Sequence, residues 1–337
     1  MNRPHATIAA ALACFALCLV LPVAAQSPGG REATPEDPWR LDLVAFGDWG
    51  ATDEYRADQL AVRDGLRGWL RGHPARFVML LGDNFYKAGV KSVDDPLWKQ
   101  RFEDVYTGPE FAIPFHAILG NHDWGGNARA QIEYSRRPGT RWRMQEAPWV
   151  IEEGGSEEAP LAAFFLIDTV RWRENEESRR KQTGKLRTLL QSSRAHWKII
   201  CGHHPVFGNG KEGDDVVLAN SLRRVIVEFG VDLYLCGDQH NLQVLPARDR
   251  LKADRTLYVV VGGGGADLRD LARTDGTVFQ AKTHGFLDLS LDLENARVRL
   301  VDKTGAVLHD GTLPKREGAR AYRIAATTPA TGAGAQK

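Results

Sequence analysis

Beyond its first 25 residues the sequence contains only two cysteines, no excess of either charge and no long apolar run. These cysteines, Cys201 and Cys236, do not make the thiolate cluster of a structural zinc site. Once Arg3 is set aside, 43 basic residues balance 43 acidic ones, which argues against a nucleic-acid or polybasic membrane partner. No later stretch is apolar enough to span a bilayer. We therefore expect a soluble monomer that binds neither nucleic acid nor membranes.

The one long apolar run lies at the N-terminus, where Arg3 precedes Ile8–Leu21 and the small residues 23–25 follow it. This order of charge, apolar segment and small residues is typical of a secretory signal peptide. We predict that residues 1–25 are a signal peptide and that the protein is secreted or periplasmic. An exported protein can hold a disulfide between its two remaining cysteines, and two buried free thiols are the alternative.

Residues 26–40 are rich in Pro, Gly and charge and are predicted to be a linker. Residues 317–337 are rich in Ala, Thr and Gly and are predicted to be a disordered tail. Between them, residues 41–316 alternate short apolar runs with helical periodicity, without an internal repeat. No linker divides this stretch, so we predict one α/β domain built on mixed sheets.

Within this domain the hydrophobic pattern predicts strands and helices in alternation, followed by strands alone. Short apolar runs predict strands at Leu41–Gly47, Phe77–Leu81, Ile113–Leu119, Ala163–Ile167, Trp197–Cys201, Val231–Cys236 and Leu257–Val261. Helical periodicity predicts helices at Arg56–Arg71, Leu97–Tyr106, Gln182–Ser193 and Val216–Phe229. The last strands are predicted at Phe286–Leu291, Val298–Val301 and Ala306–Leu308.

Polar side chains follow five of these strands at the point where each strand ends. They are Asp48, then Asp83 with Tyr86, Asn121 with His122, His203 with His204, and Asp238 with His240. In α/β sheets, residues just past the carboxyl ends of strands converge on one crevice. Carboxylate, phenol, amide and imidazole donors suit the harder first-row metal ions and zinc. The pattern therefore predicts a site for two metal ions.

The turn after the second strand carries two of the most informative residues. A carboxylate has two oxygens, so Asp83 can bridge two ions, and Tyr86 as a phenolate suits Fe(III). A strand-capping Asp with a packed Tyr is the alternative for this turn alone. Farther along, the glycines 262–265 lack the Lys-Ser/Thr ending of a nucleotide-binding loop. We predict that they form a turn whose backbone passes near the site.

Three stretches of the chain resemble one known family. They read GDNFYKAGV at 82–90, RFEDVY at 101–106, and GNHD at 120–123 leading into AQIEYS at 130–135. Over about residues 41–314 the sequence is similar to the purple acid phosphatases of the calcineurin-like metallophosphoesterase superfamily. The likeness is strongest to the small, tartrate-resistant mammalian-type enzymes. The tyrosine of the first stretch separates this family from most other metallophosphoesterases.

The resemblance implies a fold, an activity and a set of ligands. The implied fold is a four-layer αββα sandwich of two mixed β-sheets flanked by helices. The implied activity is hydrolysis of phosphomonoesters, small molecules or phosphoproteins, by a metal-activated water or hydroxide. The ligands implied for Fe(III) are Asp48, Asp83, Tyr86 and His240. Asp83 would also bridge to a divalent ion (Fe, Mn, Zn or Mg), whose further ligands would be Asn121 and His203.

Two histidines are candidates for the substrate side. His122, next to Asn121, is the candidate to contact the phosphate and to protonate the leaving oxygen. A residue that only orients a metal ligand is the alternative for His122. His204 is the second candidate for substrate binding, with a solvated loop residue as the alternative.

The sequence departs from the family at two places near the chemistry. The family motif reads Gly-His-Asp-His-Asn where this chain has GDQHN at 237–241, so Asp238 replaces a histidine ligand of the divalent ion. The loop after Pro205 carries Lys211 and Glu212 where the mammalian-type enzymes carry a second substrate-facing histidine. These departures favour one alternative function, a metal- or phosphate-binding protein with impaired turnover. A phosphodiesterase of the same fold is the other alternative.

Overall fold

The computed structural model describes residues 37–248, 254–272, 276–315 and 322–325. The predicted signal peptide lies outside these residues, and so do positions 26–36 of the predicted linker. Most of the predicted disordered tail also lies outside them. Its residues 322–325 are an exception, because Arg323 and Ile324 pair with the edge of a sheet.

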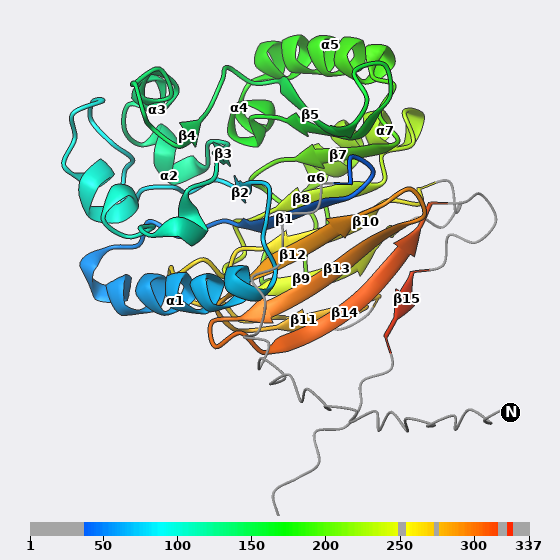
Figure 1. Cartoon of the computed structure of the whole chain (residues 1–337). Helices are drawn as coiled ribbons and strands as arrows, with labels where there is room; N and C mark the ends of the chain where they lie inside the picture. The colour runs from blue at the N-terminus through cyan, green and yellow to red at the C-terminus, as the bar shows by residue number, and fades with distance from the viewer. Residues whose placement is uncertain (1–36, 249–253, 273–275, 316–321, 326–337) are drawn as a thin grey trace, which may run out of the picture. The chain divides into compact units, whose positions relative to one another are not determined.

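In the described residues the strands form two mixed sheets, one of eight strands and one of seven (Figure 1). The order in the larger sheet is β15 (Arg323–Ile324), β14 (Val307–Pro314), β13 (Asn295–Asp302), β12 (Gly285–Leu291), β1 (Leu41–Phe46), β2 (Val78–Leu80), β3 (Phe115–Ala117), β4 (Trp142–Arg143). The order in the smaller sheet is β11 (Phe279–Ala281), β9 (Leu242–Pro246), β10 (Leu257–Val261), β8 (Leu233–Cys236), β7 (Trp197–Cys201), β6 (Pro160–Leu166), β5 (Trp149–Gly155).

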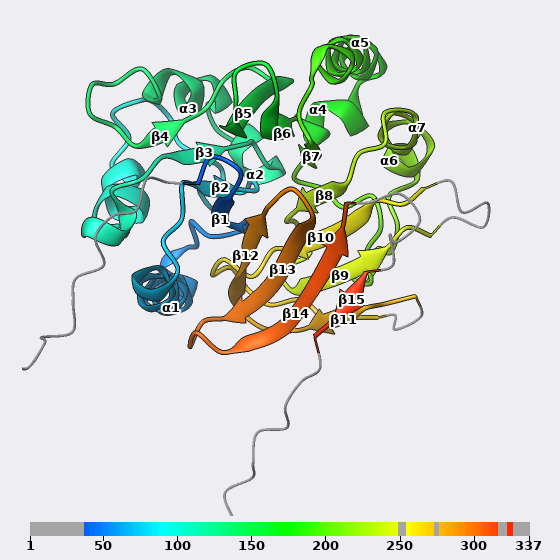
Figure 2. The same cartoon turned by 45° about the vertical axis from the view of Figure 1, so that its right-hand side comes forward.

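Helices connect the strands and cover the sheets (Figures 1 and 2). The α-helices are α1 (Arg56–Gly72), α2 (Asn121–Trp124), α3 (Ala128–Tyr134), α4 (Thr169–Glu174), α5 (Glu176–Ser192), α6 (Val216–Asn220) and α7 (Leu222–Glu228). Shorter helical segments are η1 (Asp53–Tyr55), the π-helical η2 (Trp98–Glu103) and η3 (Pro109–Phe111). None of the helices in the described part of the chain has the length and apolarity that crossing a bilayer requires.

The alternation of side chains along β12 shows that the larger sheet has a helix on one face and the smaller sheet on the other. Phe286 and Asp288 both contact Trp69 of α1, the latter by a 3.0 Å hydrogen bond from the indole Nε1. A Cβ on Gly285, one position earlier, would lie 3.1 Å from Leu242 of β9. Because successive residues of a strand point to opposite faces, β12 lies between α1 and the smaller sheet.

Strand β6 is buried on both faces in the same way within the smaller sheet. Phe164 packs edge-on against Phe77, next to β2, with ring centroids 5.3 Å apart. Its neighbour Phe165 joins a second core with Leu186 and Leu190 of α5. The sheets therefore pack face to face with helices outside, which confirms the predicted four-layer sandwich of mixed sheets.

The predicted elements are present, with differences in helix type, bounds and continuity and with some strands not predicted. The predicted helix 97–106 is the short π-helical segment η2, and the helix predicted at 182–193 starts earlier, at Glu176. The helix predicted at 216–229 is interrupted at Ser221. The hydroxyl of Ser221 donates a hydrogen bond to the backbone oxygen of Val217 and accepts one from the indole Nε1 of Trp172. The strands that sequence reasoning missed are β4, β5, β9, β11 and β15.

The two cysteines are free and buried. Cys201 pairs in register with Leu235 on the neighbouring strand β8, so Cys236 is offset from it by one residue. Cys201 therefore faces the core between the sheets, while Cys236 faces the core under the helices. The two thiols point to opposite faces, and the alternative of two buried thiols holds.

Candidate functional site

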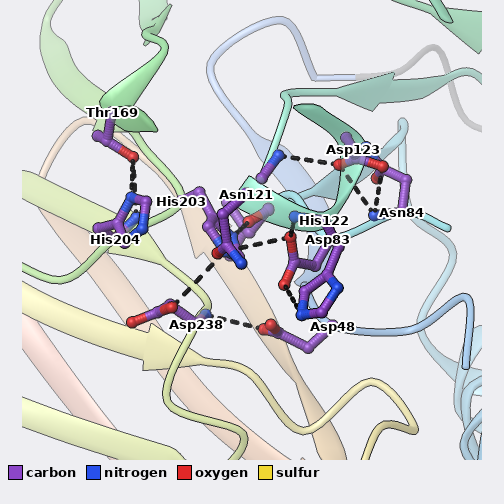
Figure 3. A network of polar contacts seen from close by, with 12 residues as sticks. Asp48, Asp83, Asn84, Asn121, His122, Asp123, Thr169, His203, His204 and Asp238 are labelled. Atoms are coloured by element: carbon purple, nitrogen blue, oxygen red, sulfur yellow. Dashed lines mark hydrogen bonds and ion pairs between the residues drawn. The ribbon is translucent and has the colours of Figure 1, made fainter. Parts of the chain in front are cut away.

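The predicted site residues come together because the strands that precede them run in parallel. Strands β1, β2 and β3 are parallel in the larger sheet, and β7 and β8 are parallel in the smaller one. Their carboxyl ends meet at one edge of the two facing sheets. Figure 3 shows predicted side chains gathered at these ends, among them Asp83, His203 and Asp238. Five distant parts of the chain thus build one cluster.

The first group of donors is centred on the phenol of Tyr86. Its hydroxyl lies 3.1 Å from Asp48 Oδ1 and 3.0 Å from Asp83 Oδ2. It also lies 3.1 Å from His240 Nε2, which is itself 3.3 Å from Asp48 Oδ1. One phenol proton satisfies only one of these three acceptors. A cation at this position would satisfy all of them.

The second group of donors is centred on His203. Its Nε2 lies 3.1 Å from Asn121 Oδ1 and 3.4 Å from Asp83 Oδ1. The carboxylate of Asp238 points toward the same imidazole, with 3.8 Å from its Oδ1 to Nε2 (Figure 3). Asp83 therefore presents one oxygen to each group. This is the geometry expected of a bridging carboxylate.

The backbone is held in an uncommon conformation at several of these positions. A positive φ, which L-residues other than Asn, Asp and His rarely adopt, is found at Asp48 (59°), Asp83 (50°), Asp238 (67°) and His240 (43°). Such conformations are costly and cluster where a fold must aim a side chain at a functional site. Here they turn the chain sharply at the strand end, so that the side chain points into the crevice.

Two glycines are required by the close approach of backbone to these donors. A Cβ on Gly120 would lie 2.2 Å from Asp83 Oδ1. A Cβ on Gly262 would lie 2.7 Å from the backbone nitrogen of His240 and 2.9 Å from Asp48 Oδ2. The glycine-rich turn at 262–265 therefore passes next to the site, as predicted from its sequence.

Backbone carbonyls determine which nitrogen each imidazole presents. His203 Nδ1 lies 2.9 Å from the carbonyl of Leu81, and His240 Nδ1 lies 2.6 Å from the carbonyl of Asp267. A carbonyl only accepts, so each Nδ1 carries the hydrogen. Each Nε2 then faces the carboxylates. A neutral imidazole held in this way is a ready metal ligand.

The electrostatics of the cluster favour positive charge inside it. Burial disfavours the charged form of His203, but Asp83, Asp48 and Asp238 outweigh burial and raise its pKa well above the ordinary value. Burial also raises the pKa of Asp83, but His203 and His122 outweigh burial and lower it. Burial, with Asp48 and Asp83, raises the pKa of Tyr86. A phenolate would need a strong cation beside it.

His122 lies at the rim of the cluster, with its side chain 29% exposed. Its Nδ1 lies 2.5 Å from the carbonyl of Lys87 and therefore carries a hydrogen. Its Nε2 points to the site, 3.9 Å from Asp83 Oδ2, and the ring packs against Tyr86 with centroids 4.3 Å apart. The Nε2 of His122 thus faces the place where a substrate would lie.

His204 is buried, not solvated, because Thr169 holds it. The Thr169 hydroxyl lies 2.9 Å from His204 Nδ1 and accepts from its backbone nitrogen at 2.9 Å (Figure 3). Burial, then the neighbouring His203, lowers the pKa of His204 well below the ordinary value. Its side chain also lies close enough to His203 and Asp238 for the three to hold an ion. The substrate-side and metal-side readings of His204 are therefore both compatible with its position.

Asp123 lies beside the cluster, and sequence reasoning assigned it no role, although it ends the GNHD motif. It is fully buried and accepts from the backbone nitrogens of Gly120, Asn84 and Phe85. It also accepts from the side chains of Asn84 and Gln131. Asp123 thereby ties the turn after β2 to the turn after β3. Its position directly after His122 was the available signal.

Gln239 is the second residue that sequence reasoning missed. Its Oε1 accepts from the backbone nitrogen of Gly210 at 3.0 Å and from Gln243 at 2.8 Å. A Cβ on Gly208 would lie 2.3 Å from Gln239 Nε2. The Gln239 side chain therefore fills the space under the loop 205–215 and ties this loop to the strand end that carries Asp238 and His240.

A cleft of about 750 Å³ opens onto this cluster. Asn121, His204 and Asp238 line its inner end, and residues of α4, α6 and the loop 205–215 form its outer wall. A larger cavity of about 980 Å³ opens beside α3, β4 and α5, and it contains none of the predicted site residues. The smaller cleft is therefore the one in which the chemistry of the cluster can reach a ligand.

The sequence profile of the calcineurin-like phosphoesterases matches residues 41–242. Tartrate-resistant acid phosphatase type 5 of Oryctolagus cuniculus is 30% identical over 268 residues, which are 74% of this chain and 79% of the relative. Purple acid phosphatase 3 of Arabidopsis thaliana is 28% identical over 292 residues, 80% of this chain and 76% of the relative.

Solved structures show the same fold. The structure titled GAP50, the anchor in the inner membrane complex of Plasmodium, superposes with a TM-score of 0.70 at 24% identity. The superposition covers 82% of this chain and 90% of the GAP50 chain. The purple acid phosphatase PPD1 of yellow lupin (Lupinus luteus) seeds superposes with a TM-score of 0.63 at 19% identity, over 81% of this chain and 53% of that one.

The fold, the clustered donors and the matched profile define the class of protein. The chain belongs to the calcineurin-like phosphoesterase family, whose members are metal-dependent phosphoesterases with a dinuclear metal centre. Its curated relatives place it among the purple acid phosphatases of that family. The predicted family and fold class are thereby confirmed.

Proposed function

We propose that the protein is an exported phosphatase that hydrolyses phosphomonoesters at a binuclear metal site built by the cluster at the strand ends. The observation that carries the proposal is the orientation of His203 and His240. Both imidazoles give their Nδ1 hydrogen to a backbone carbonyl and turn Nε2 toward buried carboxylates. A lone pair that faces a buried carboxylate is stable only with a proton or a metal ion between them, and one metal ion can satisfy an imidazole and two carboxylates at once.

The donor set supports two ions that share Asp83. In this proposal one ion, Fe(III), is held by Asp48, Asp83, Tyr86 and His240. The second, divalent ion is held by Asp83 together with Asn121, His203 and Asp238. Oxygen and imidazole donors fit Fe, Mn, Zn or Mg at the second position. The ions would supply a nucleophilic water at working pH and charge stabilisation of the phosphoryl group.

The chain's own residues would position the substrate and manage the proton. His122 presents Nε2 at the rim of the cluster, where it can hold the phosphate and give a proton to the leaving oxygen. The buried His204 is held by Thr169 at the inner end of the cleft, where it can contact a phosphate oxygen. The network around Asp123 keeps the turns that carry Asp83 and His122 in register.

The test is turnover of a chromogenic phosphomonoester against the corresponding phosphodiester, with metal analysis of the purified protein. We expect about two metal ions per chain, at least one of them iron, and faster hydrolysis of the monoester. Preferred hydrolysis of the diester would favour a phosphodiesterase. Bound metal and bound phosphate without turnover would favour a binding protein, for which the replacement of a family histidine by Asp238 is the motivating observation.

Export rests on the N-terminal pattern at residues 1–25. We propose that the mature protein acts as a secreted or periplasmic monomer on phosphoester small molecules or phosphoproteins. The mass of the protein recovered from outside the cytoplasm tests export and cleavage. Its mass under native conditions tests the monomeric state. The expected mature N-terminus lies directly after Ala25.

A further inference from the structure

We infer that the outer wall of the cleft selects phosphate monoesters whose leaving group is uncharged and apolar. The same wall disfavours leaving groups that carry a carboxylate or a second phosphate. This inference rests on the proposed function, because it names the substrate class of the same cleft.

The inner end of the cleft sets the direction in which a leaving group must point. Asn121, His204 and Asp238 line that end, so a phosphate bound at the cluster lies there. The remainder of a monoester then extends along the outer wall, between α4 and α6. A leaving group therefore contacts the side chains of these two helices and of the loop between β7 and α6.

Part of this wall is apolar and solvent-facing. Val216 is 71% exposed, more than any other large hydrophobic side chain that the structure describes. A single exposed valine is common on protein surfaces. Val216 differs because the half-buried Val217 lines the same cleft, together with Val170 and Pro205, which are themselves buried. Covering this surface with an aryl or alkyl group would remove it from water.

The charged part of the wall offers little to an anionic leaving group. Arg173 is paired with Asp215, with 2.6 Å between Nε and Oδ2. Asp214 is paired with Arg248 at 2.6 Å. Glu212 is exposed and lines the cleft beside these pairs. A second phosphate or a carboxylate would have to break an ion pair or lie close to Glu212.

A second cation, Arg269, also lines the cleft, but it lies at the inner end and not on the outer wall. Its Nη1 donates to the backbone oxygen of Asp238 at 2.9 Å, at the inner end. Arg269 can therefore assist the phosphate that is hydrolysed. The outer wall keeps its acidic character.

The wall is held in place by contacts between the helices that form it. Trp172 of α4 donates from Nε1 to Ser221 Oγ, between α6 and α7, at 2.9 Å. Asp215 caps α6 by accepting from Leu218 at 2.8 Å and also binds Arg173 of α4. These contacts hold the start of α6, which carries Val216, against α4, so the wall can discriminate between leaving groups by shape and charge.

The experiment compares phenyl phosphate with 4-carboxyphenyl phosphate, two aryl monoesters that differ by one carboxylate. For the metal-loaded wild type we expect kcat/KM to be about tenfold higher for phenyl phosphate. Val216→Asp should lower kcat/KM for phenyl phosphate by about tenfold, the usual effect of a lost apolar contact in a binding site. The matched control Val307→Asp places the same change on β14, away from the cleft, and should leave both values unchanged.

A second variant tests the charge of the wall. Glu212→Lys should raise kcat/KM for 4-carboxyphenyl phosphate about threefold at low ionic strength, and the gain should disappear in high salt. Glu157→Lys, in the turn after β5, is the matched control. Equal kcat/KM for the two esters in the wild type would overturn the inference, and so would equal effects of Val216→Asp and Val307→Asp.

Failure of the proposed function is distinguishable from failure of this inference. Absence of turnover with both esters would overturn the proposed phosphatase activity. Calorimetric binding of phenylphosphonate and 4-carboxyphenylphosphonate to the metal-loaded chain then tests the wall directly. Tighter binding of the uncharged phosphonate, weakened by Val216→Asp, supports the inference, and equal binding overturns it.

Discussion

At the scale of single residues, the phenol of Tyr86 joins the first group of donors. It lies within 3.1 Å of an oxygen or nitrogen of Asp48, Asp83 and His240. These acidic neighbours and burial raise its pKa, so the phenolate forms only when a strongly charged cation displaces the proton. Tyr86 is thus the residue that should report directly on Fe(III).

Tyr86→Phe should abolish visible absorption in the iron-loaded protein while leaving the fold intact. A phenolate bound to Fe(III) produces a charge-transfer band in the visible range, and phenylalanine has no oxygen to produce one. The measurement is the absorption spectrum, with Tyr134→Phe as the control because that tyrosine bonds Glu103 away from the cluster. A coloured Tyr86→Phe protein would show that another residue supplies the phenolate.

Asp238 is one of the two places where the resemblance predicts a departure from the family, and we expect its effect to be electrostatic. A carboxylate in place of an imidazole adds one negative charge beside His203 and makes the centre less positive. A less positive centre acidifies water less and binds phosphate more weakly. An oxygen donor also favours Mn or Mg over Zn.

Asp238→His should therefore move the pH optimum to lower pH and increase activation by Zn relative to Mn. The measurement is the pH profile of kcat/KM with each metal, accompanied by metal content. An unchanged profile and an unchanged metal preference would show that Asp238 takes no part in metal binding, despite its orientation toward His203.

At the scale of elements, the loop 205–215 and the strand end 237–241 are joined through Gln239. The space between them is filled, because a Cβ on Gly208 would lie 2.3 Å from the Gln239 amide. Gly208→Ala alone should destabilise the protein by about 2 kcal/mol through overpacking. In a Gln239→Ala background, where the amide that the new Cβ would meet is absent, Gly208→Ala should destabilise the protein much less.

The measurement is a double-mutant cycle on the free energy of unfolding, together with hydrogen exchange at the Gly210 amide. We expect a coupling of about 1 kcal/mol or more between the two positions. Exchange at Gly210 should become faster in Gln239→Ala because its acceptor is lost. Additive effects would mean that the loop is held by other contacts.

Strand β3 contains a pH-sensitive group, His116. Burial, then Arg143, lowers its pKa from 6.5 to about 4. The unfolded chain therefore binds a proton near pH 6.5 that the folded chain does not bind until about pH 4. The free energy of unfolding therefore keeps its full value from this group above pH 6.5. It falls as the pH is lowered from 6.5 through the folded-state pKa of about 4, by up to about 3 kcal/mol in total.

His116→Gln should flatten the dependence of the free energy of unfolding on pH between 6.5 and 4. The measurement is denaturant unfolding at several pH values in that window for the wild type and the variant. His116 packs edge-on against Phe77, so the variant should also lose some stability at neutral pH. An identical slope in both proteins would assign the acid sensitivity to other groups.

At the scale of the whole molecule, the cluster of donor side chains draws on both sheets. Asp48, Asp83 and Tyr86 follow strands of the larger sheet, whereas His203, Asp238 and His240 follow strands of the smaller one. Ions bound between them would add contacts across the sandwich that the unfolded chain cannot make. Binding to the folded state alone stabilises it by about 4 kcal/mol when the free ion exceeds Kd a thousandfold.

Removal of the metals with a chelator should therefore lower the Tm of the wild type. Asp83→Ala should lose both ions, all activity and this dependence on chelator, because Asp83 faces both groups of donors. The measurement is thermal unfolding with and without chelator, with metal content determined in parallel. Asp64→Ala on the exposed face of α1 is the control. Full metal content in Asp83→Ala would contradict the bridging role.

The sequence by itself determined the family and the class of fold. Short apolar runs ending in Gly-Asp or Gly-Asn turns place donors at the carboxyl ends of strands, and this local pattern needs no knowledge of packing. The family motifs then determined the four-layer sandwich of mixed sheets. Strands such as β9, which directly follows the donor turn at 237–241, were missed because tertiary packing, not a distinct local period, specifies them.

Only the tertiary structure decided how distant segments act on one another. The one-residue offset between β7 and β8 separates the two cysteines, and the carbonyls of Leu81 and Asp267 decide which imidazole nitrogen faces the cluster. The roles of Asp123 and Gln239, and the wall that includes Val216, likewise depend on contacts across the fold. Such contacts join residues far apart in the chain, so no local sequence pattern encodes them.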